Sequence, residues 1–195
     1  MNRSIALVAA GAIAVLLSPP PAAATRPALG PISSSSVTAP RGLLSEDDAE
    51  RILGRPVEPL ELRPELVPDL AECPAYALLG KKFDQRVAYE GDGEAISEFV
   101  TYGGEETPVL DDLSTCSKGT EPGGTVIEID TVPAPGGPGN VDTTFTRDDS
   151  PEPFHMVARV TDDGSNIEIL TSGTSEQAKM AMKIALARYN GTPVP

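Results

Sequence analysis

Few side chains in this sequence could act as a nucleophile, a base or a metal ligand. Its 195 residues include one histidine, His155, and two cysteines, Cys73 and Cys116. A thiol nucleophile or a zinc site would therefore have to recruit His155, and no G-x-S-x-G segment supplies a serine nucleophile. We expect His155 to be an ordinary half-exposed strand residue; the alternative is the base of a catalytic triad.

Adjacent carboxylates are the other candidates for acid-base chemistry. Such a pair could serve an exported hydrolase in the way that glycosidases use two carboxyl groups. In a chain with 29 Asp and Glu residues and a net charge of -14, however, neighbouring aspartates are more often helix caps and turn residues. We expect the structural role and keep the hydrolase as the alternative. The pairs are Asp47/Asp48, Asp111/Asp112, Asp148/Asp149 and Asp162/Asp163.

No pattern predicts a metal or a cofactor. The short acidic turns at residues 92–94 and 162–164 do not continue into the twelve-residue spacing of a calcium loop. The glycine-rich residues 136–139 lack the lysine and the following helix of a phosphate loop. The expected cofactor is none.

Tyrosine and arginine side chains offer a recognition surface instead. Tyr76, Tyr89 and Tyr102 lie on or beside predicted strands, near Arg86. Tyrosine contributes contact area and a hydroxyl at low entropic cost, so these four residues are the predicted ligand-binding set, lining a groove. The alternative is that the tyrosines are core and sheet residues with only their hydroxyls at the surface.

Length and charge limit the classes of protein. The length fits one domain with tails. A net charge of -14 repels phosphate backbones, so nucleic acid and anionic membranes are excluded as first expectations. Cationic or neutral partners remain open.

The N-terminus predicts export. Arg3, the apolar residues 5–17 and the Ala-Ala-Ala at residues 22–24 form a signal peptide over residues 1–24. A membrane-spanning helix is the alternative, but it needs ~20 apolar residues. No cysteine adjoins the cleavage site, so we expect no stable membrane anchor after signal cleavage. Residues 25–41 predict a flexible Pro/Ser/Ala-rich tether, residues 42–190 the domain and residues 191–195 a tail.

Export also bears on the cysteines. Because an oxidising compartment favours pairing, we expect a disulfide between Cys73 and Cys116. The alternatives are a reactive thiol and a metal ligand, although no C-x-x-C pair is present.

Three segments predict helices. Ser45 is a cap before an acidic first turn, and Gly54 with Pro56 ends that helix. A second short helix begins with Pro108 at its first position and leads to Cys116. The third runs from a capping box at residues 174–177 to Asn190 and Gly191, which we interpret as a C-cap rather than a glycosylation site.

The third helix has an alanine-rich face that suits close packing on a sheet. That face carries Ala178, Ala181, Met182, Ala185 and Tyr189. We place Met180 and Ile184 on the other side, either as a modest docking patch or covered by the tether.

Alternating residues predict strands and a fold class. Residues 86–90 and 95–102 flank a Gly-Asp-Gly turn, and further strands cover residues 125–132, 141–146, 154–161 and 166–171. Short connections predict an antiparallel β-sheet meander. With the helices packed on one face, the expected class is α+β, a single domain.

The order of these features resembles a group of exported actinobacterial proteins. The group includes small cell-envelope lipoproteins and the extracellular sensor domains of mycobacterial transmembrane serine/threonine kinases. The resemblance implies a helix-flanked antiparallel sheet with disulfides that binds an envelope ligand in a cleft. This chain lacks the group's second disulfide, lipid-attachment cysteine and kinase portion. The features are Leu43-Leu44-Ser45, residues 49–54, Cys73 to Tyr76, Cys116, residues 158–160 and 167–170, and the final Ala-rich helix.

Two functions follow from these observations. The first is a secreted, non-enzymatic binding or sensor-like domain. Its partner would be an unknown envelope ligand or protein, and its location would be outside the cell or at the cell wall. The alternative is an exported hydrolase that uses a carboxylate pair. A bell-shaped pH profile would be the mark of the hydrolase.

Overall fold

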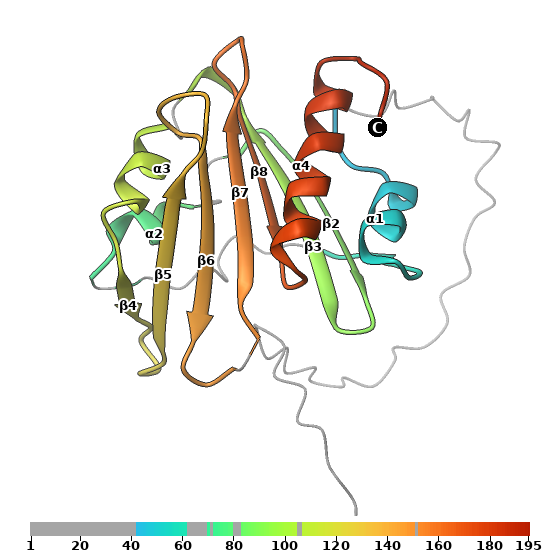
Figure 1. Cartoon of the computed structure of the whole chain (residues 1–195). Coiled ribbons are helices and arrows are strands. Elements are labelled where there is room, and N and C mark those ends of the chain that lie inside the picture. The colour runs from blue at the N-terminus through green and yellow to red at the C-terminus, as the bar shows by residue number, and fades with distance from the viewer. Residues whose placement is uncertain (1–41, 62–69, 71, 80–82, 105–106, 151) are drawn as a thin grey trace, which may run out of the picture. The chain divides into compact units, whose positions relative to one another are not determined.

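The described part of the chain begins at Gly42 and is built on an antiparallel sheet. The computed structural model describes residues 42–61, 70, 72–79, 83–104, 107–150 and 152–195 (Figure 1). The chain divides into residues 1–39 and residues 40–195, and all described residues belong to the second unit. The predicted signal peptide and tether lie outside the described residues.

The described residues form an eight-stranded sheet in the order β1-β2-β3-β8-β7-β6-β5-β4. Every pair of neighbours is antiparallel. The predicted hairpin and the later predicted strands are confirmed within a residue or two at most ends, whereas β1 and β4 were not predicted. The strands are β1 (Glu58–Pro59), β2 (Gln85–Gly91), β3 (Glu94–Thr101), β4 (Lys118–Thr120), β5 (Val126–Pro133), β6 (Val141–Arg147), β7 (Phe154–Val160) and β8 (Asn166–Thr171).

The strand order departs from a simple meander at one point. After β3 the chain passes through a short 3-10 turn, η2 (Tyr102–Gly104), and the helix α3 (Thr107–Leu113) to the far edge of the sheet. It then returns strand by strand until β8 pairs with β3. β8 and its two neighbours, β3 and β7, all have consecutive buried residues, so these three strands are covered on both sides and form the middle of the sheet.

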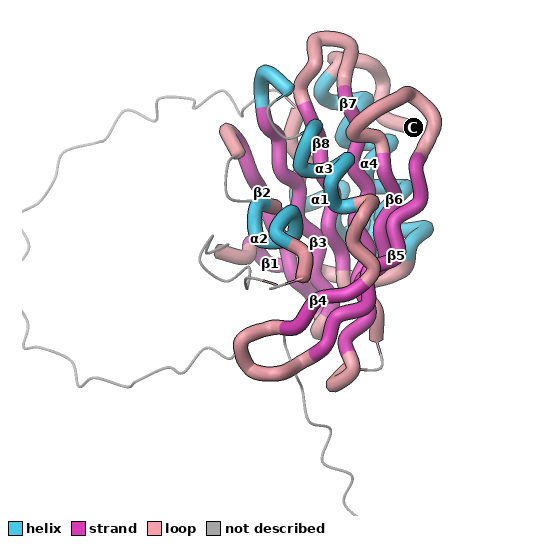
Figure 2. Tube along the Cα trace, turned by 90° about the vertical axis from the view of Figure 1, so that its left-hand side faces the viewer, coloured by secondary structure: helices cyan, strands magenta, loops and turns pink. Residues whose placement is uncertain are grey.

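The helices divide over the two faces, which corrects the expectation of helices on one face. Val157 of β7 packs in a cluster with α1 (Glu46–Leu53) and α4 (Ser175–Tyr189). Its neighbours Met156 and Ala158 pack in a second cluster with α2 (Pro74–Leu78) and α3. Because successive strand residues point to opposite faces, the sheet has an α4 face and an α2 face. Figure 2 shows the sheet between α2 and α4.

The predicted caps of α1 and α4 are confirmed. Ser45 and Asp48 form a capping box, and Gly54 ends α1 with φ 72°. Thr174 and Gln177 form the capping box of α4. Beyond Asn190, the C-cap of α4, Gly191 adopts φ 65°, which is the conformation that glycine tolerates best.

The alanine face of α4 is confirmed, but the position predicted for Ile184 is wrong. Ala178, Ala181 and Ala185 are fully buried, and Met180 is exposed as expected. Ile184 is only 1% exposed because it packs in the cluster that α4 shares with α1. A helix covered from two directions needs a wider apolar surface than one stripe provides.

The predicted disulfide is confirmed. It joins Cys73, the N-cap of α2, to Cys116, shortly after α3, with a sulfur-sulfur distance of 2.01 Å. Closing a loop of this length stabilises a fold by about 4 kcal/mol in the chain-entropy model. The bridge therefore holds together the two helices of the α2 face. Among the described residues, no helix is both long and apolar enough to span a membrane.

Candidate functional site

The α4 face is covered over only part of its width. α4 packs on β7 and β8, with α1 beside it, and in the described structure no helix lies over β5 and β6 (Figure 1). Cross-strand pairs show which residues of the outer strands lie on this face. Asp142 is opposite Val157, which packs under α4, and Thr144 is opposite His155. In the same way, Asp130 is opposite Thr144. The uncovered side chains, which we call the open face, are Glu128, Asp130, Thr144 and Thr146.

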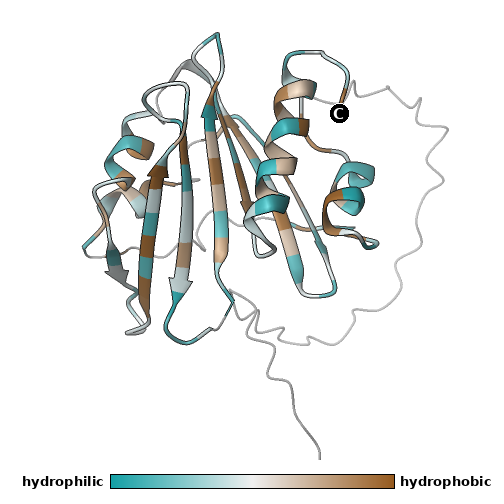
Figure 3. Cartoon of the chain, in the orientation of Figure 1, coloured by the Kyte–Doolittle hydropathy of each residue, from teal (hydrophilic) through white to brown (hydrophobic). Residues whose placement is uncertain are grey.

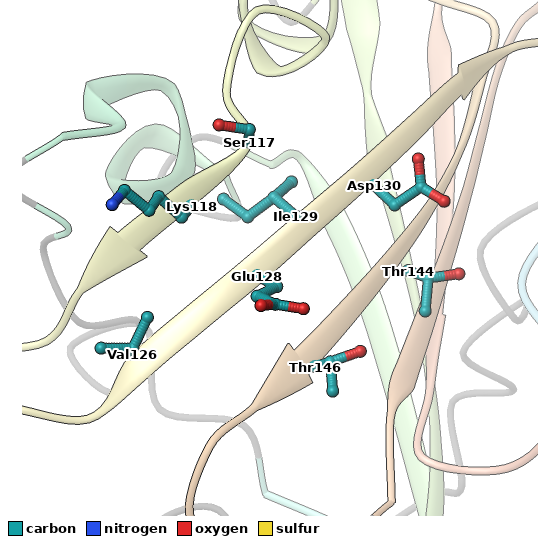
Figure 4. A pocket seen from close by; sticks show the side chains of 8 residues that line it. All are labelled: Ser117, Lys118, Val126, Glu128, Ile129, Asp130, Thr144 and Thr146. Carbon is teal, nitrogen blue, oxygen red and sulfur yellow. The ribbon is translucent and has the colours of Figure 1, made fainter.

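The open face is hollowed. A cavity of about 570 Å³ lies over it and is bordered by β4 (Figure 4). Among the described residues, neither Glu128 nor Asp130 has a hydrogen bond or an ion pair through its side chain. In Figure 4 the ammonium group of Lys118 points away from both carboxylates. The lining residues are Ser117, Lys118, Val126, Glu128, Ile129, Asp130, Thr144 and Thr146.

Side chains at the border of the open face are held in place. The hydroxyl of Thr144 lies 3.2 Å from Nδ1 of His155. Burial lowers the pKa of His155, and the charge of Lys179 on α4 acts in the same direction. This half-buried strand position fits the ordinary histidine expected from the sequence. Arg159 pairs with Asp142 at 2.7 Å beside the open face.

The aspartate pairs are occupied by structural contacts. In each of the four pairs, at least one carboxylate accepts a hydrogen bond from backbone or pairs with an arginine, as expected for caps and turns. Among the described residues, no group of three or more His, Cys, Asp or Glu side chains could hold a metal. The contacts are Asp48 to Ser45 N (3.0 Å) and Arg188, Asp111 to Gly139 N (2.7 Å), Asp148 to Val126 N (3.1 Å), Asp149 to Arg147 (2.9 Å), and Asp163 to Ser165 N (3.0 Å).

Two of the four predicted ligand-binding residues belong to the α2 face. The ring of Tyr76 contacts Phe145 edge to face, with centroids 5.4 Å apart, and is buried in the cluster under α2. Burial raises the pKa of Tyr76 to about 12. Arg86 of β2 is exposed, with its guanidinium 5.0 Å from the centre of the Phe83 ring.

The other two predicted ligand-binding residues, Tyr89 and Tyr102, do not lie beside Tyr76. Tyr89 points to the α4 face, where it is buried and its hydroxyl donates to the backbone oxygen of Leu44 at 3.2 Å. Tyr102 follows β3 and is 42% exposed. Tyr76, Arg86, Tyr89 and Tyr102 therefore do not line one groove. Arg86 and Tyr89 are three positions apart on β2, and because side chains alternate between the two faces of a strand, an odd spacing places them on opposite faces.

The α2 face also has a cavity, which is small and apolar. Its volume is about 70 Å³, enough for only a few water-sized groups. The rings of Phe145 and Phe154 stack beside it, with centroids 4.6 Å apart. The cavity on the open face is therefore the larger and more polar of the two.

Sequence reasoning did not single out the open face. A signal was nevertheless present: the centre of β5 and all of β6 are polar on one side, at Glu128, Asp130, Asp142, Thr144 and Thr146. Figure 3 shows the alternation along β5. A strand that is polar on one side has no helix over that side.

No protein-family model matches the sequence, and no characterised protein is similar enough to it to count as a match.

Proposed function

We propose that this protein is a secreted, non-enzymatic binding domain of the cell envelope, and that its ligand contacts the open face. The role corresponds to that of the extracellular sensor domains and envelope lipoproteins that the sequence resembles. The observation that carries the proposal is the hollowed half of the sheet, where Glu128 and Asp130 have no ion pair among the described residues and lie beside the hydroxyls of Thr144 and Thr146.

Export is supported by two independent features. The signal-peptide pattern of residues 1–24 belongs to proteins that leave the cytoplasm. A disulfide between the only two cysteines suits an oxidising compartment outside the membrane. Location at the cell wall, rather than free diffusion, is part of the proposal through the expected envelope ligand.

The chemistry of the open face favours a polar ligand. Glu128 and Asp130 are acceptors, and Thr144 and Thr146 can both donate and accept hydrogen bonds. None of the described residues that line this cavity is aromatic, which favours hydrogen bonding over stacking as the mode of binding. We propose a ligand that is neutral or cationic and rich in hydrogen-bond donors.

Co-sedimentation with washed actinobacterial cell walls tests the proposal. The mature, disulfide-bonded protein is mixed with the insoluble walls, and the bound fraction is measured against protein concentration. The double variant Glu128→Gln/Asp130→Asn is expected to bind at least tenfold more weakly, because each lost charged acceptor costs about 1 kcal/mol or more.

A matched variant controls for net charge. Glu58→Gln/Glu90→Gln removes the same two charges from exposed positions on β1 and β2, at the other end of the sheet, and is expected to bind as the wild type does. Equal binding by all three proteins, or none by the wild type, contradicts the proposal. Release of soluble wall fragments during incubation would indicate the hydrolase instead.

A further inference from the structure

A buried carboxyl group holds the segment that leads into α1. Glu98, in the middle of β3, is 0% exposed. Its Oε2 accepts a hydrogen bond from the backbone N–H of Leu44 at 2.5 Å. The hydroxyl of Tyr89 donates to the backbone oxygen of the same residue at 3.2 Å. Two side chains of the sheet thus hold both backbone polar groups of Leu44, and we call Leu44, Tyr89 and Glu98 the Leu44 clamp.

Packing fixes the same segment. The Leu44 side chain is 2% exposed and belongs to the core cluster of α1 and α4. Gly42 has φ 108°, and a Cβ at this position would lie 3.1 Å from Cα of Tyr189. The chain can therefore approach the end of α4 only because residue 42 is glycine. Residues 42–44 are a short strap between α4 and the sheet.

The surroundings of Glu98 disfavour its ionised form. Burial raises the pKa of Glu98 to about 8, although the Leu44 N–H and Arg188 act in the opposite direction. Charged and titratable groups reach it from three elements: Asp48 of α1, Arg188 of α4 and Tyr89 of β2. From β8 the residue opposite is Ile169.

Among the described residues, Arg188 makes no hydrogen bond or ion pair with Glu98; its guanidinium pairs with Asp48 at 2.5 Å and donates to the Ser45 hydroxyl at 3.0 Å. In the described structure the second oxygen of Glu98, Oε1, is buried without a hydrogen-bond partner. An ionised Glu98 would thus be a poorly compensated charge in a dry site.

We propose that the Leu44 clamp is a pH-sensitive lock, which holds residues 42–44 and the start of α1 on the sheet while Glu98 is protonated and lets them open when Glu98 loses its proton. The ionised carboxylate gains water when the strap opens, so deprotonation favours opening. The lock does not depend on the proposed binding function.

The sign and the pH range follow from the two states. In the opened state Glu98 has its ordinary pKa of 4.5, and in the closed state about 8. The opening equilibrium therefore rises with pH between these values, by up to about tenfold per pH unit, and becomes constant above pH ~8. Acidification tightens the strap.

Hydrogen exchange of the Leu44 amide measures the lock directly, because this N–H is the donor to Glu98. The full chain, with its disulfide intact, is compared with Glu98→Gln from pH 6 to 9, after correction for base catalysis of exchange. We expect the wild-type opening equilibrium to rise with the slope above and Glu98→Gln to show no slope. The amide of Ile169 should not change in either protein.

Two further variants keep the test decisive. Glu90→Gln, at an exposed position of the same hairpin, should keep the wild-type profile. Tyr89→Phe loses one contact of the clamp, so its strap should open more at every pH, with the same dependence of the opening equilibrium on pH as the wild type. This variant keeps the proposal testable if Glu98→Gln does not fold. A flat wild-type profile, the same slope in Glu98→Gln, or a parallel rise at Ile169 would overturn the proposal.

Discussion

Two buried carboxyl groups on the α4 side of the sheet, Asp48 and Glu98, have pKa values that are shifted in opposite directions. Both are at most 5% exposed. Burial raises the pKa of each, but Asp48 also accepts hydrogen bonds from Ser45 and pairs with Arg188, and the net effect lowers its pKa. Glu98 has the Leu44 N–H as its one hydrogen-bond donor among the described residues. Residue type alone does not set the charge; the number of partners does.

At the residue scale we predict that Asp48→Asn destabilises the protein by about 2 kcal/mol at pH 7, because it leaves Arg188 without its anion. The folded-state pKa of Asp48 lies below 3.8, so its contribution is present above that pH and is lost as pH falls further. Urea unfolding should show a smaller difference in the free energy of unfolding between the wild type and Asp48→Asn at pH 3 than at pH 7.

The neighbouring residue provides the control for this prediction. Asp47 lies in the same first turn of α1 and is exposed. Asp47→Asn should cost less than about 0.5 kcal/mol at either pH. An equal cost for the two variants would show that helix-terminal charge, rather than the pair with Arg188, accounts for the effect.

At the element scale, a capping box defines the N-terminus of α4. Thr174 accepts a hydrogen bond from the backbone N–H of Gln177 at 3.2 Å, and the Gln177 side chain accepts one from Thr174 N at 2.6 Å. The buried alanines add close packing but little apolar area. The cap therefore fixes where the helix begins on the sheet.

We predict that Thr174→Ala lowers the free energy of unfolding by about 1 kcal/mol, because two N-terminal donors lose their acceptors or their geometry. Ser175→Ala is the matched change: among the described residues the Ser175 side chain makes no hydrogen bond, and its loss should be nearly neutral. Thermal unfolding followed by circular dichroism distinguishes them. A similar decrease in melting temperature in both variants would contradict a stabilising role of the capping box.

For the whole molecule, the sheet separates two apolar clusters that are stabilised differently. The cluster under α4 and α1 is closed by two capped helices. The cluster under α2 and α3 is covered by helices of only five and seven residues, which are too short to be stable alone. The disulfide joins these two helices, and Cys73 is itself fully buried.

We predict that Cys73→Ala/Cys116→Ala lowers the free energy of unfolding by about 3 to 4 kcal/mol. Guanidinium unfolding of the wild type with and without reductant should give the same difference, and the double variant should not respond to reductant. A loss below about 1 kcal/mol would mean that packing alone holds the α2 face.

Sequence patterns of short range predicted much of the fold. The caps at Ser45, Gly54 and Thr174, the turn before β3 and the strand alternation are each decided within about four residues. β1, β4 and α2 were missed because they contain two, three and five residues, too few to show a period. The predicted ligand-binding residues are near one another in the sequence, but they do not lie on the same face of the sheet.

The sequence by itself determined the antiparallel α+β class, the pairing of its two cysteines and the ends of its longer helices. Only the tertiary structure decided that β3 pairs with β8, that Tyr76 and Tyr89 lie on opposite faces, and that β5 and β6 are left open. Alternation shows which residues of one strand share a face. Which helix covers that face depends on contacts between segments far apart in the chain, and no local pattern encodes them.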